Sequence, residues 1–135
     1  MHSRHDERGT AVTAFGVTMV AALIMMAGLV IDGGQKVTAT SRAATAAAGA
    51  SRAAGNAAAT QQLAGRNPAG PAVLAARAYL AGQPGVRGSV SVADGIVSIS
   101  TEATEPTIFL SAIGLSSVTG RGASEASVVG TGEQR

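Results

Sequence analysis

The sequence predicts a membrane-anchored α+β protein. We expect a long N-terminal transmembrane helix with an alanine-rich helical extension, then a small domain with a short helix, a β-hairpin, a short helix and a third strand. Three observations support this fold class. Residues 10–31 carry no charge, alanine makes up half of residues 39–64, and an Asp94-Gly95 pair separates two runs of alternating valine and serine.

The uncharged run, "TAVTAFGVTMVAALIMMAGLVI", is long enough to cross a bilayer. Its 22 residues would span about 33 Å as a helix, against about 30 Å of hydrocarbon. Arg8 and Asp32 bound it. A buried core helix of this length needs a larger globule than 135 residues supply. Secretory cleavage is the other alternative, with A-x-A-like sites in "VTATSRAATAAAGA", but the run exceeds the usual apolar length of a signal peptide.

The distribution of Lys and Arg does not decide the orientation, because basic residues flank both ends of the run. Residues 1–9 are interpreted as a short cytoplasmic stub. The residues after Asp32 are rich in Ser, Thr and Gly and are interpreted as an exported part. The expected localisation is therefore the cell membrane, single-pass, with the N-terminus cytoplasmic and the C-terminal domain extracytoplasmic.

Residues 32–66 are expected to form an alanine-rich helical stem, because alanine has the best intrinsic helix propensity. The stem has no stripe of large apolar residues, so a flexible stalk is the alternative. Asp32, Gly33 and Gly34 mark the membrane exit, and the two glycines are a candidate hinge. Asp32 and Gln35 have capping-box spacing, so one helix could end and another begin here, or a single helix could continue.

Residues 71–129 are expected to form the small extracytoplasmic α+β domain. "PAVLAARAYLA" predicts a short helix that ends at Gly82. A two-residue Asp94-Gly95 turn sets the hairpin register, with Val90 opposite Ile99 on the buried face. The same register places Arg87 opposite Glu102 as a favourable cross-strand pair.

After the hairpin, the chain is expected to form one more short helix and one more strand. "TIFLSAIGL" follows Pro106 and predicts a short apolar helix or turn that closes at Gly114. "SSVTGRGASEASVV" alternates weakly and predicts a third, edge-like strand. The tail, residues 130–135, is expected to be disordered.

Composition argues against several function classes. The net charge is +2, there is no basic run, and the aromatic residues are two Phe and one Tyr, so nucleic-acid binding is not expected. The chain contains no cysteine, which excludes disulfides and thiolate zinc sites. His2 and His5 have an H-x-x-H spacing without structural support, so we predict no metal site.

Catalytic motifs are likewise missing from the sequence. No histidine follows His5, which rules out a Ser-His-Asp or Cys-His arrangement in the exported part. "DGGQK" lacks the ending of a phosphate-binding loop and follows an apolar helix rather than a strand. The sequence therefore predicts no enzyme and no cofactor. One interaction pattern stands out: Ala14, Thr18 and Ala22 recur every four residues, the spacing of close helix-helix packing in lipid.

An R-G junction, an apolar helix, "AGLVIDGG" at its end and then "SRAATAAAGA" form a recognisable order. Together with "AYLAG", the Val/Ser hairpin and "EPTIFLSAIGL", this order resembles the TadE/TadG-like proteins of tight-adherence (Flp) pilus assembly systems, in the short actinobacterial form. The resemblance covers the whole chain. It implies a pilin-like minor subunit or assembly component that is membrane-anchored and faces outward.

The resemblance also implies partners and a processing site. The partners would be the lipid bilayer, other pilus or pilin-like subunits, the assembly machinery and a prepilin peptidase. Such a peptidase cleaves just after a glycine ahead of the apolar helix, which here corresponds to Gly9 followed by Thr10. Ala14 stands where related prepilins often carry glutamate, which favours a TadG-like anchor that stays in the membrane. The alternative function is a membrane-tethered binding or adhesion module unrelated to a pilus.

Overall fold

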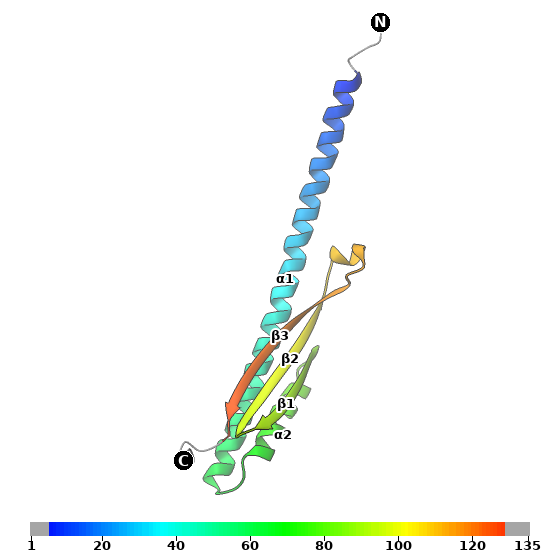
Figure 1. The fold of residues 1–135 in the computed structure, drawn as a ribbon. Coiled ribbons are helices and arrows are strands. Elements are labelled where there is room, and N and C mark those ends of the chain that lie inside the picture. Colours follow the sequence, from blue (N-terminus) through cyan, green and yellow to red (C-terminus); the bar gives the residue numbers. More distant parts are fainter. Residues whose placement is uncertain (1–5, 129–135) are drawn as a thin grey trace.

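The computed structural model describes residues 6–128 (Figure 1). Its elements are α1 (Asp6–Leu63), α2 (Ala69–Ala81), β1 (Val86–Ala93), β2 (Ile96–Pro106), the 3₁₀ helix η1 (Leu110–Ile113) and β3 (Ser117–Ser127). The protein is thus α+β, with a long apolar N-terminal helix and a small antiparallel sheet. The tail predicted to be disordered and both histidines lie outside the described residues.

α1 is one continuous helix from the apolar run through the alanine-rich stem. It passes through Gly33 and Gly34 without a break, so the single-helix alternative is the one seen, and a hinge motion at these glycines stays a prediction. The two glycines cost about 1 kcal/mol each relative to alanine, a cost that the long helix on either side tolerates. No second helix begins at Asp32, and the stem ends at Leu63, where Gly65 adopts a φ of 65°.

The three strands form one antiparallel sheet in the order β1-β2-β3. The predicted hairpin register is confirmed, with Val90 opposite Ile99 and Val92 opposite Val97. Asp94 and Gly95 have φ values of 49° and 72°, the positive pair that a type I′ turn requires. The third strand is also confirmed, and the predicted short helix after Pro106 is the 3₁₀ helix η1, closed by Gly114.

The sheet packs one face against the C-terminal half of α1, and α2 covers the β1 side (Figure 1). The face of α1 toward the sheet is a stripe of buried alanines: Ala39, Ala43, Ala46, Ala47, Ala50, Ala54 and Ala58. Opposite them lie the larger core residues, Val90, Val97, Ile99 and Val128. The alanine-rich segment is therefore a packed helix and not a flexible stalk.

β3 lies against the backbone of α1 because its inward positions hold glycine. A Cβ atom on Gly120 would lie 2.1 Å from Thr40 N, and one on Gly122 would lie 2.5 Å from Ala43 C. The Thr101 hydroxyl from β2 reaches the same place and donates to Ala43 O at 2.7 Å. Small residues on both elements thus give a core of backbone against backbone.

Two details of the small domain differ from the sequence predictions. Arg87 and Glu102 are register partners, but Glu102 forms its ion pair with Arg121 of β3, at 2.8 Å between Nε and Oε1. β2 is the central strand, so Glu102 has neighbours on both sides, and the hairpin alone could not reveal the second one. In addition, α2 begins at Ala69 rather than at Pro71.

Candidate functional site

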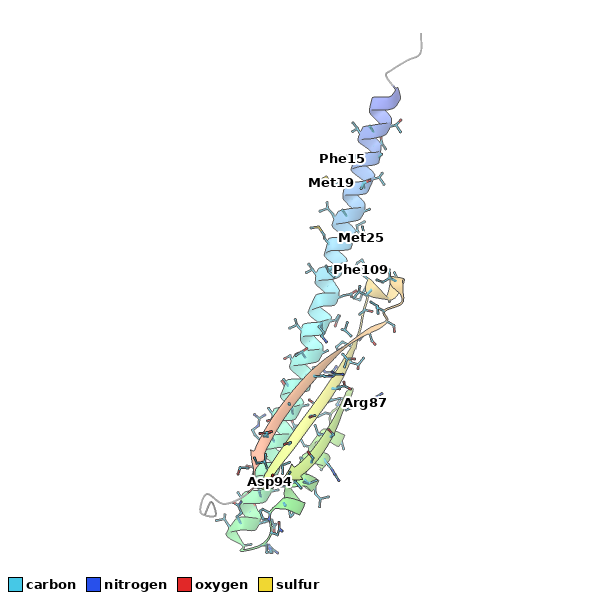
Figure 2. The ribbon with its side chains drawn as sticks, viewed as in Figure 1. Phe15, Met19, Met25, Arg87, Asp94 and Phe109 are labelled. Atoms are coloured by element: carbon cyan, nitrogen blue, oxygen red, sulfur yellow. The ribbon has the colours of Figure 1, made fainter. Side chains whose placement is uncertain are left out.

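The N-terminal half of α1 is bare and apolar. Within residues 10–31, all of which the structure describes, only Gly28 is buried. Figure 2 shows Phe15, Met19 and Met25 projecting from a helix with no neighbouring element. This helix is long and apolar enough to cross a membrane. An exposed apolar surface of this size needs a partner phase or a partner protein.

The candidate packing residues lie on this bare half. Ala14, Thr18 and Ala22 are exposed, and the Thr18 hydroxyl donates to Ala14 O at 2.8 Å. Because its hydroxyl is satisfied within the helix, Thr18 presents a small surface with no unpaired donor. Gly9 and Thr10, the candidate cleavage residues, lie near the start of α1, and space around the Gly9 Cα is open.

Asp32 has a role that the sequence did not suggest. Its side chain is only 1% exposed and accepts three consecutive backbone N–H groups. Ile108 N lies 2.8 Å from Oδ1, and Phe109 N and Leu110 N lie 3.1 and 2.6 Å from Oδ2. Asp32 therefore does not face water. It caps the free N–H groups at the start of η1, as an N-cap side chain does, but from a distant helix.

Two opposing effects act on the Asp32 carboxyl. Burial raises its pKa, and the three N–H donors lower it by more, so the net pKa lies below the ordinary value of 3.8. The carboxylate is thus ionised at neutral pH. Hydrogen bonds to a charged acceptor are stronger than those between neutral groups, which favours a well-held contact between α1 and the loop.

The segment bound by Asp32 is defined here as the apolar loop, residues 107–116. Phe109 packs on Gly28, where an added Cβ would lie 2.6 Å from the Phe109 Cγ. Within the loop, Thr107 N donates to Ser116 O at 3.1 Å and Leu115 N donates to Leu110 O at 3.0 Å. These bonds close the loop on itself beside the helix.

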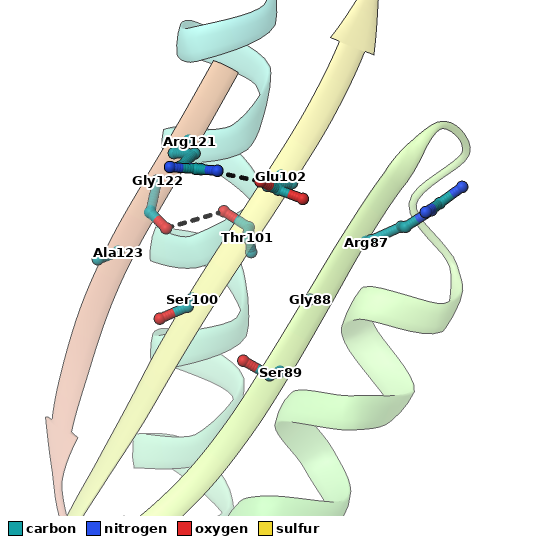
Figure 3. A pocket seen from close by; sticks show the side chains of 9 residues that line it. All are labelled: Arg87, Gly88, Ser89, Ser100, Thr101, Glu102, Arg121, Gly122 and Ala123. Carbon is teal, nitrogen blue, oxygen red and sulfur yellow. Dashed lines mark hydrogen bonds and ion pairs between the residues drawn. The ribbon is translucent and has the colours of Figure 1, made fainter. Parts of the chain in front are cut away.

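A second candidate surface is a shallow hollow on the outer face of the sheet (Figure 3). It has a volume of about 650 Å³ and is lined by Arg87, Gly88, Ser89, Ser100, Thr101, Glu102, Arg121, Gly122 and Ala123. The Arg121–Glu102 pair lies within it, and both side chains are well exposed. Such a surface can offer hydrogen bonds to a polar partner. Among residues 6–128 there is no cluster of side chains suited to hold a metal ion.

Further polar contacts tie α1 to the segments that cover it. Arg42 forms an ion pair with Glu105, which is largely buried, and donates to Pro84 O at 2.7 Å. The Lys36 ammonium donates to Thr119 O. In the sequence, Glu105 simply precedes Pro106. Its partner is 63 residues away, and no local pattern points to it.

The signal that could have identified Asp32 is its isolation. It is the one acidic residue between Glu7 and Asp94, and it directly follows the apolar run. The signal for the β3 contact is the alternation of Gly120 and Gly122 in a strand, which often marks close backbone approach.

Comparisons of the chain with protein-family models, curated proteins and solved structures gave no match.

Proposed function

We propose that this protein is a pilin-like minor subunit or assembly component of an Flp-type (tight-adherence) pilus, of the TadE/TadG-like kind. It would be anchored in the cell membrane by residues 10–31, with its N-terminus in the cytoplasm and its sheet domain outside. The observation that carries the proposal is the division of α1 into a bare apolar half and a half packed on a small sheet.

Continuity of α1 favours a subunit over a tethered module. At about 1.5 Å per residue, 58 residues in one continuous helix extend about 87 Å. A tethered module needs only a loose stalk. A subunit needs a fixed relation between its packing helix and its surface domain, and a straight helix supplies this.

The bare half has the properties of a surface for close helix packing. Ala14, Thr18 and Ala22 form a small-residue strip, and large apolar side chains flank it on the rest of the circumference. In lipid, helices associate by close van der Waals contact at such strips. Other pilus subunits or pilin-like proteins are the partners of the proposal, with the bilayer around them before assembly.

Processing divides the proposal into two forms. A prepilin peptidase would cut between Gly9 and Thr10 and free a new N-terminus. The absence of glutamate at Ala14 removes the acidic group that would meet that terminus in a neighbour, and this favours an anchor that stays in the membrane. Both forms use the same helix and the same sheet domain.

The test is the intact mass and N-terminal sequence of the native protein from two fractions, the membrane and sheared pili. Protein in sheared pili with Thr10 as its first residue would support the subunit form. An intact chain confined to the membrane, and required for piliation, would support the assembly form. A chain that begins after the alanine-rich segment, or whose deletion leaves piliation unchanged, would contradict the proposal.

The alternative is a membrane-tethered extracytoplasmic binding or adhesion module unrelated to a pilus. The hollow on the outer sheet face, between Arg87 and Arg121, is the observation that favours it. Replacing Arg87, Glu102 and Arg121 with serine distinguishes the two functions. Loss of adhesion with normal piliation would support the tethered module. Loss of piliation would instead favour the pilus role.

A further inference from the structure

The apolar loop carries an exposed surface that the proposed function does not use. Four large side chains are well exposed there: Ile108, Phe109, Ile113 and Leu115, with Ile113 the most exposed at 74%. The sequence has no charged residue between Glu105 and Arg121. A concentrated apolar patch of this kind marks a contact with another protein or with a membrane.

The position of the loop along α1 is fixed. Phe109 contacts Gly28 and Asp32 binds the start of η1, so the loop lies beside the last turn of the apolar run. Figure 2 shows Phe109 next to α1, a short way along the helix from Met25. If residues 10–31 cross the hydrocarbon, Gly28 lies about 4.5 Å inside its boundary, because each residue advances about 1.5 Å.

The backbone of the loop is prepared for a medium of low polarity. Unpaired N–H groups are costly in lipid, so a segment that enters the membrane boundary is favoured when the protein itself satisfies them. Most N–H groups of the loop have an acceptor within the protein: those of Thr107, Ile108, Phe109, Leu110, Ala112, Gly114 and Leu115. The Asp32 carboxylate supplies the acceptor for three of them.

The same bonds serve Asp32. A carboxylate at the hydrocarbon boundary loses much of its hydration, and the three N–H donors replace the water. The loop thus shields the carboxylate from the hydrocarbon, and the carboxylate accepts hydrogen bonds from the loop N–H groups. A loop surrounded only by water would not need the Asp32 carboxylate, because water accepts hydrogen bonds from exposed N–H groups.

We propose that the apolar loop inserts into the interfacial region of the bilayer, in the leaflet on the side of the sheet domain, as a second membrane contact next to α1. This inference rests on the membrane anchoring in the proposed function. Interfacial elements commonly bury their apolar side about 5–10 Å below the headgroups, a depth at which Ile108, Ile113 and Leu115 would contact acyl chains. The surface continues that of the helix itself, and this favours lipid over a second copy of the chain.

The test uses the full chain, which contains no native cysteine, in vesicles of phosphatidylcholine and phosphatidylglycerol. Ile113→Cys carries a nitrobenzoxadiazole probe, and quenching is measured with lipids that bear a nitroxide near the headgroup or near the chain end. Leu74→Cys is the matched control, because Leu74 is exposed and apolar but lies on α2. Leu23→Cys reports on membrane insertion of α1.

The expected result is blue-shifted emission at position 113, with more quenching by the shallow nitroxide than by the deep one. Position 74 should show neither effect, and position 23 should be quenched most by the deep nitroxide. Quenching at 23 without quenching at 113 overturns the loop proposal alone. Absence of quenching at 23 overturns the membrane anchoring. A blue shift at 113 that follows protein concentration and is insensitive to both lipids assigns the loop to a second copy.

Discussion

Residues 10–31 and residues 39–58 of α1 share one backbone but bury their side chains in opposite ways. The first segment is rich in Val, Met, Leu and Ile, and nearly all of these side chains are exposed. The second is rich in alanine, and a full stripe of those alanines is buried. In most globular proteins large apolar side chains are buried and small side chains are often exposed. In α1 the large apolar side chains are exposed and the alanines are buried.

The reversal shows what each half packs against. Alanine exposes little side-chain surface, but it lets the sheet backbone approach the helix closely, and β3 answers with glycine at positions 120 and 122. Large side chains would hold the strand away. Residues 10–31 carry the side chains that a hydrocarbon phase or an apolar helix partner accommodates. Substitutions at three points along α1 and at one point in β3 test this division.

The largest effect is expected from Gly120→Val. The added Cβ would lie 2.1 Å from backbone atoms of α1, which cannot move aside as a flexible side chain can. We expect β3 to detach, with a loss on the order of 4 kcal/mol in the free energy of unfolding, at the severe end for overpacking. Thermal unfolding and hydrogen exchange of the β2–β3 amides in detergent would measure it.

Gly34→Val is the matched control for this substitution. Gly34→Val also replaces a glycine with valine, but on α1. Nothing lies within 4 Å of the position that the new Cβ would take. Valine also has a better helix propensity than glycine, so this variant should keep the sheet intact. Equal loss of β2–β3 protection in both variants would contradict the close-packing explanation.

The second prediction concerns Leu23→Arg in the bare half. Arginine near the centre of a membrane helix costs about 2.5–3.5 kcal/mol on insertion scales, so the chain should shift from the membrane to the soluble or degraded fraction. Val37→Arg is the control, because Val37 is also an exposed large apolar residue but lies beyond Asp32. Alkaline extraction of membranes compares the two. Equal extraction of both variants and the parent would argue against a spanning helix.

The parts of the fold that the sequence predicts are those with local chemistry. Asp94-Gly95 and the flanking alternation give the register of β1 and β2, because turn type and period both act over a few residues. α1 as a helix follows from propensity. The continuity of α1 does not follow from local propensity, because two adjacent glycines are locally compatible with a helix end. Whether the helix continues through them depends on the residues on both sides.

The contacts that position the apolar loop could not be predicted in this way. Asp32 and Ile108 are 76 residues apart, and neither has a local pattern that names the other. The buried stripe of α1 was equally hidden, because alanine occurs on every side of residues 39–64 and a stripe of alanines among alanines has no visible period. The hairpin pattern pairs Glu102 with Arg87 for a related reason, since Arg121 lies 19 residues further along the chain on β3.

The third prediction addresses the junction between the halves. Asp32→Ala leaves three loop N–H groups without their charged acceptor, and hydrogen bonds to charged groups contribute about 1.5–3 kcal/mol. We expect faster hydrogen exchange at residues 108–110, with β2–β3 protection retained. The exchange rates in Asp32→Asn should lie between those of Asp32→Ala and the parent, because an amide keeps one acceptor oxygen. Unchanged exchange at 108–110 in Asp32→Ala would refute the contact.

Acid should reproduce part of this effect in the parent chain. Because the folded pKa of Asp32 lies below the ordinary 3.8, its stabilising contribution is fully present above that value and is lost as the pH falls toward the folded pKa. Loop protection at 108–110 should therefore be constant from neutral pH to about 5 and decline below about 4. Asp32→Ala should lack this decline. A decline near neutral pH would point to a different titrating group.

The smallest effect is expected from Gly33→Ala, and its sign is the informative part. The position is helical and open, with nothing within 4 Å of an added Cβ, so alanine should stabilise α1 by about 0.5–1 kcal/mol. Hydrogen exchange across residues 30–36 measures the change, and piliation measures its consequence. If the two halves work as one rigid helix, the variant should exchange more slowly and assemble normally. Slower exchange with lost assembly would mean that the helix must bend here during function, although it is straight in the structure.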